Sequence, residues 1–237
     1  MIKVYAATDV GKVRATNEDS QAVFAPSVYV VADGMGGEAA GEVASRLLTE
    51  TVKSILANKI HIDESELQQA ILSANQKILQ CANNEPHYHG MGTTASMLHI
   101  DDLARSACWA HVGDSRIYVL HDGDNRMIQI TRDHSYVESL VEQGSITAEE
   151  AKVHPRRNML LRAVGVEEGL QVDTGSLTVR AEDIFLLATD GLMKLISDSK
   201  IVAILQSHCT NPAQALVTAA LEAGGADNVT VIVVVCD

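Results

Sequence analysis

The chain has 237 residues, of which 18 are basic and 31 acidic, and its formal net charge is −13. So acidic a protein is a poor ligand for nucleic acid or for an anionic membrane surface, and we expect neither as a partner. The sequence has no apolar run long enough to span a membrane, no signal-peptide pattern and no closely spaced cysteines, which together predict a cytoplasmic protein.

The N-terminal part of the chain predicts short strands around a polar loop. Residues 2–8 and 20–25 have strand character, and the loop 9–19 between them carries several charged side chains. The run 28–32 is β-branched, aromatic or small throughout, which is typical of a buried strand. It ends at Asp33 and continues into a glycine-rich turn, where the backbone can approach a ligand closely.

Two long helices are predicted next. Residues 42–58 carry apolar side chains at helical spacing, and Asp63 with Glu66 resembles a capping box at the start of a second helix. Beyond that helix the pattern returns to short apolar runs separated by turns. The strands expected there are 93–100, 105–112, 116–121 and 126–131.

Residues 132–170 are more polar than the rest and lack a strong core stripe, so we expect an excursion over the surface, as in a lid. Thr147 and Glu150 form a capping box for one short helix within it. The elements expected after it are strands at 176–180 and 184–189, a helix capped by Asp198 that runs to about His208, a helix beginning at Pro212, and a strand at 229–235.

The order of these elements favours one domain of the α+β class. Runs of strands and pairs of helices are segregated along the chain, and the strict alternation of a doubly wound fold is missing. The expected architecture is therefore a set of antiparallel sheets covered by helices.

Four aspartates stand at the ends of four very apolar strands that are far apart in the sequence: Asp33, Asp114, Asp190 and Asp227. A carboxylate at the end of a buried strand is costly unless something binds it. If the four strand ends meet, the side chains form a set of oxygen ligands suited to Mg²⁺ or Mn²⁺ rather than to zinc or copper. Taken singly, Asp33 can equally be a solvated turn residue, and Asp114 a β-turn residue paired with Arg116.

Phosphate chemistry fits such a set. Two hard cations lower the pKa of a bridging water and clamp a phosphoryl group. A phosphate also needs a planar cation, and Arg14 is the best candidate because guanidinium binds phosphate through two hydrogen bonds. The alternatives are a surface ion pair for Arg14 and solvated loop positions for the nearby Glu18 and Asp19. The sequence contains no cysteine-phosphatase loop, phospho-aspartate motif or P-loop.

Seven segments, taken together and in order, resemble the motifs of the metal-dependent serine/threonine phosphatases of type 2C, the PPM family, in their compact bacterial form. They span essentially the whole chain, and their order makes the match specific. The segments are Arg14–Asp19, Val31–Gly37, Met91–Thr94, Val112–Arg116, Thr131–Ser135, Ala188–Leu192 and Asp227–Thr230.

The resemblance implies a single PPM-type phosphatase domain over residues 1–237, built as a sandwich of two antiparallel β-sheets flanked on both sides by pairs of antiparallel helices. It also implies a flap subregion at about 132–165. The implied enzyme depends on Mg²⁺ or Mn²⁺ and hydrolyses phosphoserine and phosphothreonine by direct attack of a metal-bridging hydroxide. Its implied partners are a phosphorylated protein substrate and a serine/threonine kinase that it opposes in signalling, and we expect a monomer.

The same resemblance assigns the metal ligands. Asp33 bridges two ions, and the carbonyl group of Gly34 binds the first of them. Asp190 and Asp227 hold the second ion. Asp114 together with Asp190 holds a third, weaker one.

For substrate binding and proton transfer the resemblance is less complete. Arg14 would bind the substrate phosphate, and Glu18 and Asp19 would act through metal-bound waters. Eukaryotic relatives often carry histidine, a candidate general acid, where this chain has Met35. The candidates for that role here are a metal-bound water and His154 from the flap.

Two other functions share the same motifs. A pseudophosphatase would bind phosphoproteins without turnover, but such proteins usually lack one or more metal carboxylates, and here all are present. A phosphatase for small phosphate esters stays open, because these motifs recognise phosphate and not the peptide around it.

Overall fold

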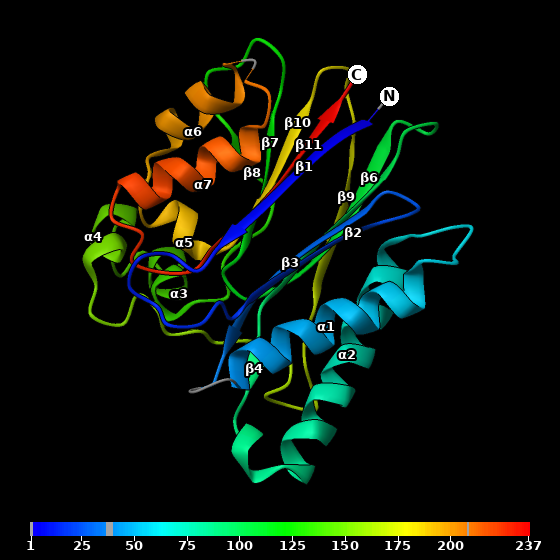
Figure 1. Cartoon of the computed structure of the whole chain (residues 1–237), viewed down its shortest axis with the longest axis vertical. Helices are drawn as coiled ribbons and strands as arrows, with labels where there is room; N and C mark the ends of the chain where they lie inside the picture. Colours follow the sequence, from blue (N-terminus) through cyan, green and yellow to red (C-terminus); the bar gives the residue numbers. More distant parts are fainter. Residues whose placement is uncertain (1, 37–39, 208) are drawn as a thin grey trace.

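The structure, a computed structural model, describes residues 2–36, 40–207 and 209–237. Two antiparallel sheets face each other, and helices cover their outer faces (Figure 1). The first sheet has the strand order β1 (Ile2–Asp9), β11 (Val229–Cys236), β10 (Ile184–Ala188), β7 (Arg116–Leu120) and β8 (Ile128–Gln129). The second has the order β2 (Asp19–Phe24), β3 (Val28–Met35), β5 (Ala95–Asp101), β6 (Ser106–Val112) and β9 (Asp173–Thr178), with β4 (Gly92–Thr93) paired to β3.

Helix pairs form the outer layers. Apolar residues of α1 (Ala40–Leu56) and α2 (Glu64–Asn84) pack on the second sheet, and those of α6 (Asp198–Leu205) and α7 (Pro212–Glu222) pack on the first. The remaining helices are η1 (Pro86–Tyr88), α3 (Tyr136–Glu142), α4 (Ala148–Val153) and α5 (Asp190–Met193). The predicted α+β sandwich is confirmed. None of the described helices is long and apolar enough to cross a membrane.

Strand β3 shows how the layers position the acidic residues. Val28 and Val30 pack toward α1 and α2, whereas Tyr29 and Val31 pack toward the other sheet. Because successive side chains alternate, a strand covered on both faces has a continuous apolar run. The same alternation places Asp33 on the face between the sheets, at the point where the strand leaves the core.

Strand pairing brings the other sequence-distant ends to the same place. Asp19 of β2 lies directly opposite Asp33 of β3. In the other sheet Ala188 of β10 pairs with Val231 of β11, and the Thr189 amide donates to the Thr230 carbonyl at 3.0 Å. The end of β10 and the start of β11 therefore lie side by side.

Some predicted boundaries are wrong for local reasons. Ser197, not Asp198, caps α6, because the Ser197 side chain accepts a hydrogen bond from the Lys200 amide. Serine and aspartate are similarly good caps, so two adjacent candidates leave the first residue undecided. The helix ends at Leu205, short of the predicted end near residue 208, which itself lies outside the described residues.

The strand predicted at 126–131 is reduced to Ile128–Gln129. It is an edge strand that pairs with β7 alone, and both of its residues are exposed. The strand predicted at 176–180 begins earlier, at Asp173. Thr147 with Glu150 forms the predicted capping box on α4. At α2 the Asp63 side chain accepts from the Glu66 amide, but the Glu66 side chain pairs with Lys59 at 2.8 Å.

Candidate active site

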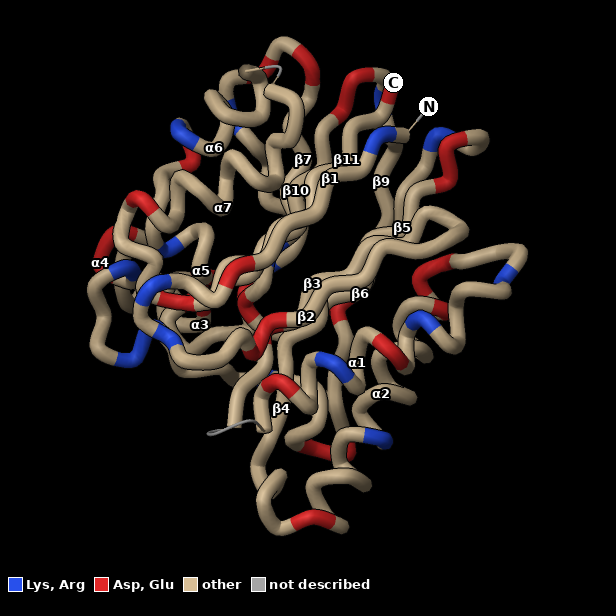
Figure 2. The backbone as a smooth tube through the Cα atoms, viewed as in Figure 1, with Lys and Arg blue, Asp and Glu red and all other residues tan. Residues whose placement is uncertain are grey.

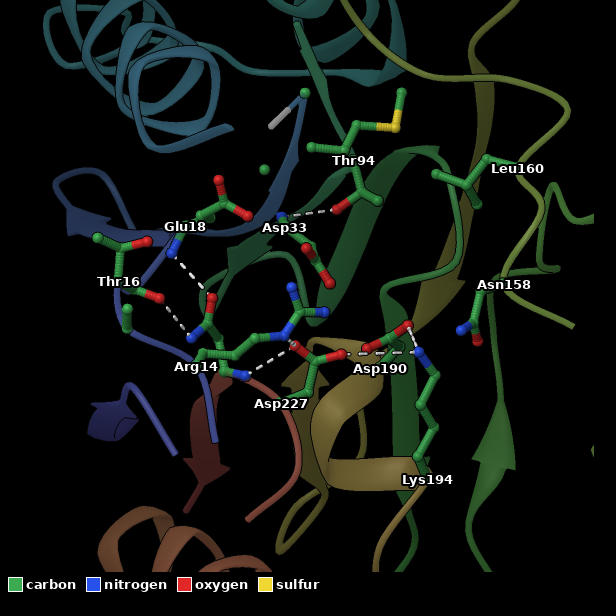
Figure 3. A pocket seen from close by; sticks show the side chains of 15 residues that line it. Arg14, Thr16, Glu18, Asp33, Thr94, Asn158, Leu160, Asp190, Lys194 and Asp227 are labelled. Carbon is green, nitrogen blue, oxygen red and sulfur yellow. Dashed lines mark hydrogen bonds and ion pairs between the residues drawn. The ribbon is translucent and has the colours of Figure 1, made fainter. Parts of the chain in front are cut away.

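A cleft of about 550 Å³ opens at the end of the sandwich where β3 and β10 finish and β11 begins (Figure 3). Its walls come from the loop after β1, the end of β3, the segment 158–160, α5 and the start of β11. The predicted site residues that line it are Arg14, Glu18, Asp33, Gly34, Asp190 and Asp227, with Met35 beside them. Acidic positions occur over the whole molecule (Figure 2), so net charge alone does not locate this cleft.

Hydrogen bonds to the backbone of Asp33 fix its place. The Asp33 amide donates to Thr94 Oγ1 at 2.8 Å, and the Asp33 carbonyl accepts from the Thr94 amide at 2.8 Å and from Thr93 Oγ1 at 3.0 Å. Burial, followed by the charges of Asp19 and Asp190, holds the pKa of the Asp33 carboxyl well above its usual range. Hydrogen bonds thus fix the backbone at the end of β3, while the Asp33 side chain lies close to other carboxyl groups.

Asp19 faces Asp33 across the β2–β3 pair and is almost fully buried. Its Oδ2 accepts from Thr189 Oγ1 at 2.8 Å, but its Oδ1 is buried with no hydrogen-bond partner. Burial, opposed by hydrogen bonds from Thr230 and Thr189 and assisted by the charge of Asp190, raises the pKa of Asp19 to about 7. A buried carboxylate oxygen without a partner is rare in proteins and calls for a ligand.

Three further acids come from other elements. Asp190 begins α5, and its Oδ1 is also buried without a partner. Asp227 precedes β11 and accepts the amide hydrogen of Asn228 at 3.0 Å. Asp114, in the loop between β6 and β7, has its pKa raised to about 7 by burial and then by the charges of Asp190 and Asp133.

We call Asp19, Asp33, Asp114, Asp190 and Asp227 the cleft acids. At Asp19, Asp33, Asp114 and Asp190, burial disfavours the charged form, and the charges of neighbouring acids add to that cost. Cations remove both penalties. With oxygen donors only, and with two buried oxygens left without partners, the residues present fit hard divalent ions such as Mg²⁺ or Mn²⁺.

Two glycines allow α1 to begin against the end of β3. A methyl group on Gly34 would overlap the carbonyl oxygen of Gly41, and one on Gly41 would lie 2.8 Å from Glu18 Oε1. The Gly34 amide also donates to the Glu18 carbonyl at 3.1 Å. This close approach holds Glu18 at the cleft. The last residue of the predicted motif, Gly37, lies outside the described residues.

Asn228 fixes the loop that carries Arg14 and Glu18. Its Nδ2 donates to the carbonyls of Val10 and Thr16, both at 2.9 Å, and its Oδ1 accepts from the Glu18 amide at 2.8 Å. One side chain at the start of β11 thereby ties the first loop of the chain to the last strand. Asn228 belongs to the last of the seven sequence segments, but nothing in that segment predicts this role for its side chain.

Two basic side chains already contact the cleft acids. Arg14 Nε lies 2.8 Å from Asp227 Oδ1, and Lys194 forms an ion pair with Asp190. Among the described residues, no three His, Cys, Asp or Glu side chains form a ready-made ligand group for a metal ion. Asp33, Asp190 and Asp227 line one cleft together with Glu18, Arg14 pairs with Asp227, and Lys194 pairs with Asp190.

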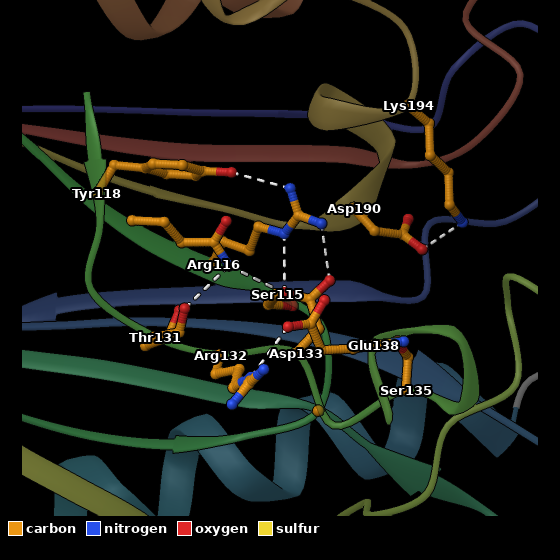
Figure 4. Close-up of polar contacts among 12 residues, drawn as sticks. Ser115, Arg116, Tyr118, Thr131, Arg132, Asp133, Ser135, Glu138, Asp190 and Lys194 are labelled. Carbon is orange, nitrogen blue, oxygen red and sulfur yellow. Dashed lines mark hydrogen bonds and ion pairs between the residues drawn. The ribbon is translucent and has the colours of Figure 1, made fainter. Parts of the chain in front are cut away.

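The structure also bears on one alternative that the sequence left open. Arg116 does not form its ion pair with Asp114. It binds Asp133 through two hydrogen bonds, at 2.8 and 2.7 Å, and also donates to Tyr118 Oη at 3.0 Å (Figure 4). Asp114 is therefore not the ion-pair partner of Arg116, and the charge of Asp190 acts on its carboxyl.

Comparison with known proteins gives the family. A family model described as protein phosphatase 2C matches residues 13–223. The chain belongs to the protein phosphatase 2C family. The resemblance inferred from the seven sequence segments is confirmed, and with it the prediction of a metal-dependent protein phosphatase.

Similar proteins support this over nearly the whole chain. The serine/threonine phosphatase Stp of Listeria innocua is 40% identical over 242 residues, which cover 96% of this chain and 93% of that protein. The crystal structure of the Mycobacterium tuberculosis serine/threonine phosphatase PstP/Ppp has a TM-score of 0.91 at 37% identity and covers 100% of this chain and 99% of its own. A structure of the catalytic domain of PstP in complex with 2 manganese ions has a TM-score of 0.88 at 37% identity, with 100% and 99% covered.

His154 lies outside the residues that line the cleft of this family member. It follows α4, its ring centroid is 5.9 Å from that of Tyr136, and its Nδ1 accepts from the Arg156 amide at 3.1 Å. Met35 does line the cleft but has no proton to give. A general-acid role for His154 stays a prediction.

Lys194 was missed by the sequence analysis. It follows Asp190 by one helical turn, and that spacing places two side chains on the same face of a helix. With a helix beginning at Asp190, the four-residue spacing alone predicts the contact between Lys194 and Asp190. The contact of Lys194 with the acids beyond Asp190 could come only from the fold.

Proposed function

We propose that this protein phosphatase 2C member hydrolyses phosphoserine and phosphothreonine in proteins with two Mg²⁺ or Mn²⁺ ions bound in the cleft. The convergence of Asp33, Asp190 and Asp227 from three separate strand ends carries the proposal. Buried oxygens without partners on Asp19 and Asp190 support it. An acidic cleft would repel a phosphate dianion, so cations must be present before such a substrate can bind.

The residues proposed to hold the ions all line the cleft. Asp33 would bridge the two, the Gly34 carbonyl would bind the first, and Asp190 with Asp227 would bind the second. When bound, such ions supply a water of lowered pKa and a positive clamp for the phosphoryl oxygens. Glu18 would act on this set through water, and we assign the same role to Asp19.

The chain itself supplies binding and orientation. Arg14 binds Asp227 through Nε and its side chain is half exposed, so its terminal nitrogens can take two oxygens of the substrate phosphate. We propose that water attacks phosphorus directly, on the side opposite the serine or threonine oxygen, and that no phosphoenzyme forms. The departing oxygen takes its proton either from water in the cleft or from His154.

We assign the whole chain, residues 1–237, to one phosphatase domain with residues 132–165 as its flap. Asn158 and Leu160 of this segment line the cleft. Backbone hydrogen bonds hold both of its ends: the His134 amide donates to the Gly113 carbonyl at 2.7 Å, and the Thr93 and Val164 amides each donate to the other residue's carbonyl, at 2.9 and 2.8 Å. The flap would thus contribute to substrate choice while its ends stay fixed.

The cellular proposals rest on the family alone. We propose that the enzyme opposes a serine/threonine kinase in signalling, acts as a monomer and is cytoplasmic. A phosphoproteome comparison with and without this chain tests the first of these, and sedimentation tests the second.

The Asp190→Asn variant tests the metal assignment. Because it removes a charged ligand and keeps the shape, we expect phosphopeptide hydrolysis with Mn²⁺ to fall by about a hundredfold or more. Asp198→Asn is the matched control, since Asp198 is exposed on α6. Hydrolysis near the wild-type rate in Asp190→Asn would refute the assignment.

Two further measurements separate the alternative functions. A pseudophosphatase would bind phosphopeptide in calorimetry but release no phosphate with Mn²⁺ present. A small-ester phosphatase would hydrolyse phosphorylated metabolites faster than phosphopeptides. We expect phosphate release, and the higher kcat/KM on phosphopeptides.

A further inference from the structure

A lysine lies in the middle of the acidic cleft. Lys194 ends the single turn of α5, four residues after Asp190, and its side chain is one-third exposed. Its Nζ binds Asp190 Oδ2 (Figures 3 and 4) and is 4.0 Å from Asp227 Oδ2 (Figure 3). The charge of Asp114 also acts on it. The lysine thus lies among three acids predicted to bind metal.

The two oxygens of Asp190 have different environments. Oδ2 binds the Lys194 ammonium, whereas Oδ1 is buried and has no hydrogen-bond partner. A carboxylate that served only to fix a lysine at a helix end would not leave its second oxygen buried and unused. The arrangement leaves Oδ1 for a metal ion while Oδ2 is already neutralised by the chain.

The charges around the cleft also balance with two ions. Four carboxylates line it, those of Glu18, Asp33, Asp190 and Asp227, and the charges of two more, on the buried Asp19 and Asp114, act on Asp33. The basic side chains that line it among the described residues are Arg14 and Lys194. Two divalent ions together with these two basic residues supply as many positive charges as there are carboxylates. Without Lys194 the cleft would keep an excess negative charge beside Asp190.

We propose that the Lys194 ammonium is a built-in cation of this site. It holds the position between Asp190, Asp114 and Asp227 in which a third divalent ion would otherwise bind, so the protein takes up two ions and not three. This inference rests on the proposed metal-dependent function and adds the number of ions to it. Lys194 acts through the acids it neutralises and is a positioning residue.

An ammonium differs from a bound divalent ion in ways that matter here. It carries a single charge and stays attached to the chain. It donates up to three hydrogen bonds, but it has no open coordination position at which a water molecule could be activated. It therefore lowers the repulsion among the acids even when no metal is bound. It also competes with any divalent ion for Asp190 Oδ2.

The test is a direct count of bound Mn²⁺, by equilibrium dialysis with elemental analysis, on the wild type and on Lys194→Asp and Lys194→Gln. We expect two ions per chain in the wild type and three in Lys194→Asp. In Lys194→Gln the Mn²⁺ dissociation constant should fall by about tenfold, because one competing positive charge is gone. The melting temperature of metal-free Lys194→Gln should also fall, because Asp190 loses its counter-ion. Lys200→Gln, at an exposed position on α6, should match the wild type in every measurement.

Three results would overturn the inference: three ions bound to the wild type, two ions bound to a folded Lys194→Asp, or an unchanged Mn²⁺ affinity in Lys194→Gln. If Lys194→Asp does not fold, the nearly isosteric glutamine variant still decides. Failure of the proposed function gives a different pattern. Wild-type protein that binds two Mn²⁺ ions but releases no phosphate from phosphopeptide would contradict the function while the ion count still supports the role of Lys194.

Discussion

Two groups of acids in this molecule are satisfied in opposite ways. Asp133 and Asp173, which we call the paired acids, each bind an arginine: Arg116 at 2.8 and 2.7 Å, and Arg162 at 2.7 Å. Each also has another donor, Gln129 for the first and His134 for the second. Among the cleft acids, Asp190 and Asp227 each pair with one basic side chain, but Asp19 and Asp190 each keep a buried oxygen without a partner.

The pKa shifts follow the same division. Hydrogen bonds from His134 and Arg162 outweigh burial at Asp173 and lower the pKa of its carboxyl, whereas burial and like charges raise the pKa values of Asp19 and Asp114 to about 7. Paired acids stabilise the fold they are part of. Crowded acids cost stability, and a fold keeps them where a ligand is to bind. The comparison therefore predicts that substitutions in the two groups change the stability of the metal-free protein in opposite directions.

The largest effect is expected from Asp33→Asn. Loss of the carboxylate proposed to bridge the two ions should lower kcat on phosphopeptide by about a thousandfold or more. The same change should stabilise the metal-free protein by on the order of 1 kcal/mol, because it removes a buried charge that faces other acids. Urea unfolding in the presence of a chelator measures the second effect. If Asp33→Asn is less stable than the wild type, Asp33 stabilises the fold as the paired acids do, and the predicted difference between the two groups is wrong.

The next effect is expected from Asp133→Asn, which leaves the Arg116 guanidinium without its bidentate partner. Because Asp133 is largely buried, the free energy of unfolding should fall by about 3 kcal/mol. Phosphatase activity, assayed well below the melting temperature, should change far less than in Asp33→Asn. Asp122→Asn, in an exposed turn, is the control. Unchanged stability in Asp133→Asn would show that pairing contributes little here.

Arg14 separates substrate binding from metal binding. Arg14→Ala should lower kcat/KM on phosphopeptide by about thirtyfold, roughly 2 kcal/mol, mainly through KM, and Arg14→Lys should recover only part of the loss. The control is Arg46→Ala, an exposed position on α1. If Arg14→Ala has wild-type kinetics, Arg14 does not bind the substrate phosphate and only forms its ion pair with Asp227.

The smallest effect is a pH dependence carried by Asp114. Its carboxyl has a folded pKa of about 7 against about 3.9 when unfolded, so the folded state holds the proton more tightly and loses stability as pH rises from about 4 through 7. Metal-free Asp114→Asn lacks this penalty. At pH 7.5 it should be more stable than the wild type by on the order of 1–2 kcal/mol, and at pH 4 the difference should vanish.

We compare the stability of Asp114→Asn with that of the wild type because other titratable groups change stability with pH in the opposite sense. Burial lowers the pKa of His111 to about 3, so that residue favours the folded state as pH rises. His111 is present in both proteins and cancels. A stability difference that is the same at both pH values would contradict the crowding of Asp114 with the other acids.

Much of the fold could be predicted from the sequence, because two-sided burial leaves a strong pattern. The continuous apolar run before Asp33 marks a strand covered on both faces, and the recurrence of such runs ending on aspartate indicated one shared site. Adjacent cap candidates at Ser197 and Asp198 could not be ranked, since their local chemistry is alike. The edge strand β8 has no such signal, because its exposed residues pack against little.

The parts of the site that could not be predicted depend on contacts between distant segments. Nothing near Asn228 in the sequence indicates that its side chain binds the carbonyls of Val10 and Thr16. Arg116 likewise pairs with Asp133, which lies beyond β8 and 17 positions away, and not with the nearby Asp114. Lys194 is an intermediate case, because its spacing in the sequence predicts the contact with Asp190 but nothing in the sequence predicts the contact with Asp227.

Anomalous diffraction from a crystal of this protein grown with Mn²⁺ tests the central claim most directly. It locates the ions by their own scattering and does not depend on activity. We predict peaks within bonding distance of carboxylate oxygens of Asp33, Asp190 and Asp227 in the cleft. Peaks confined to acidic residues elsewhere on the surface, with none between these three strand ends, would contradict the account.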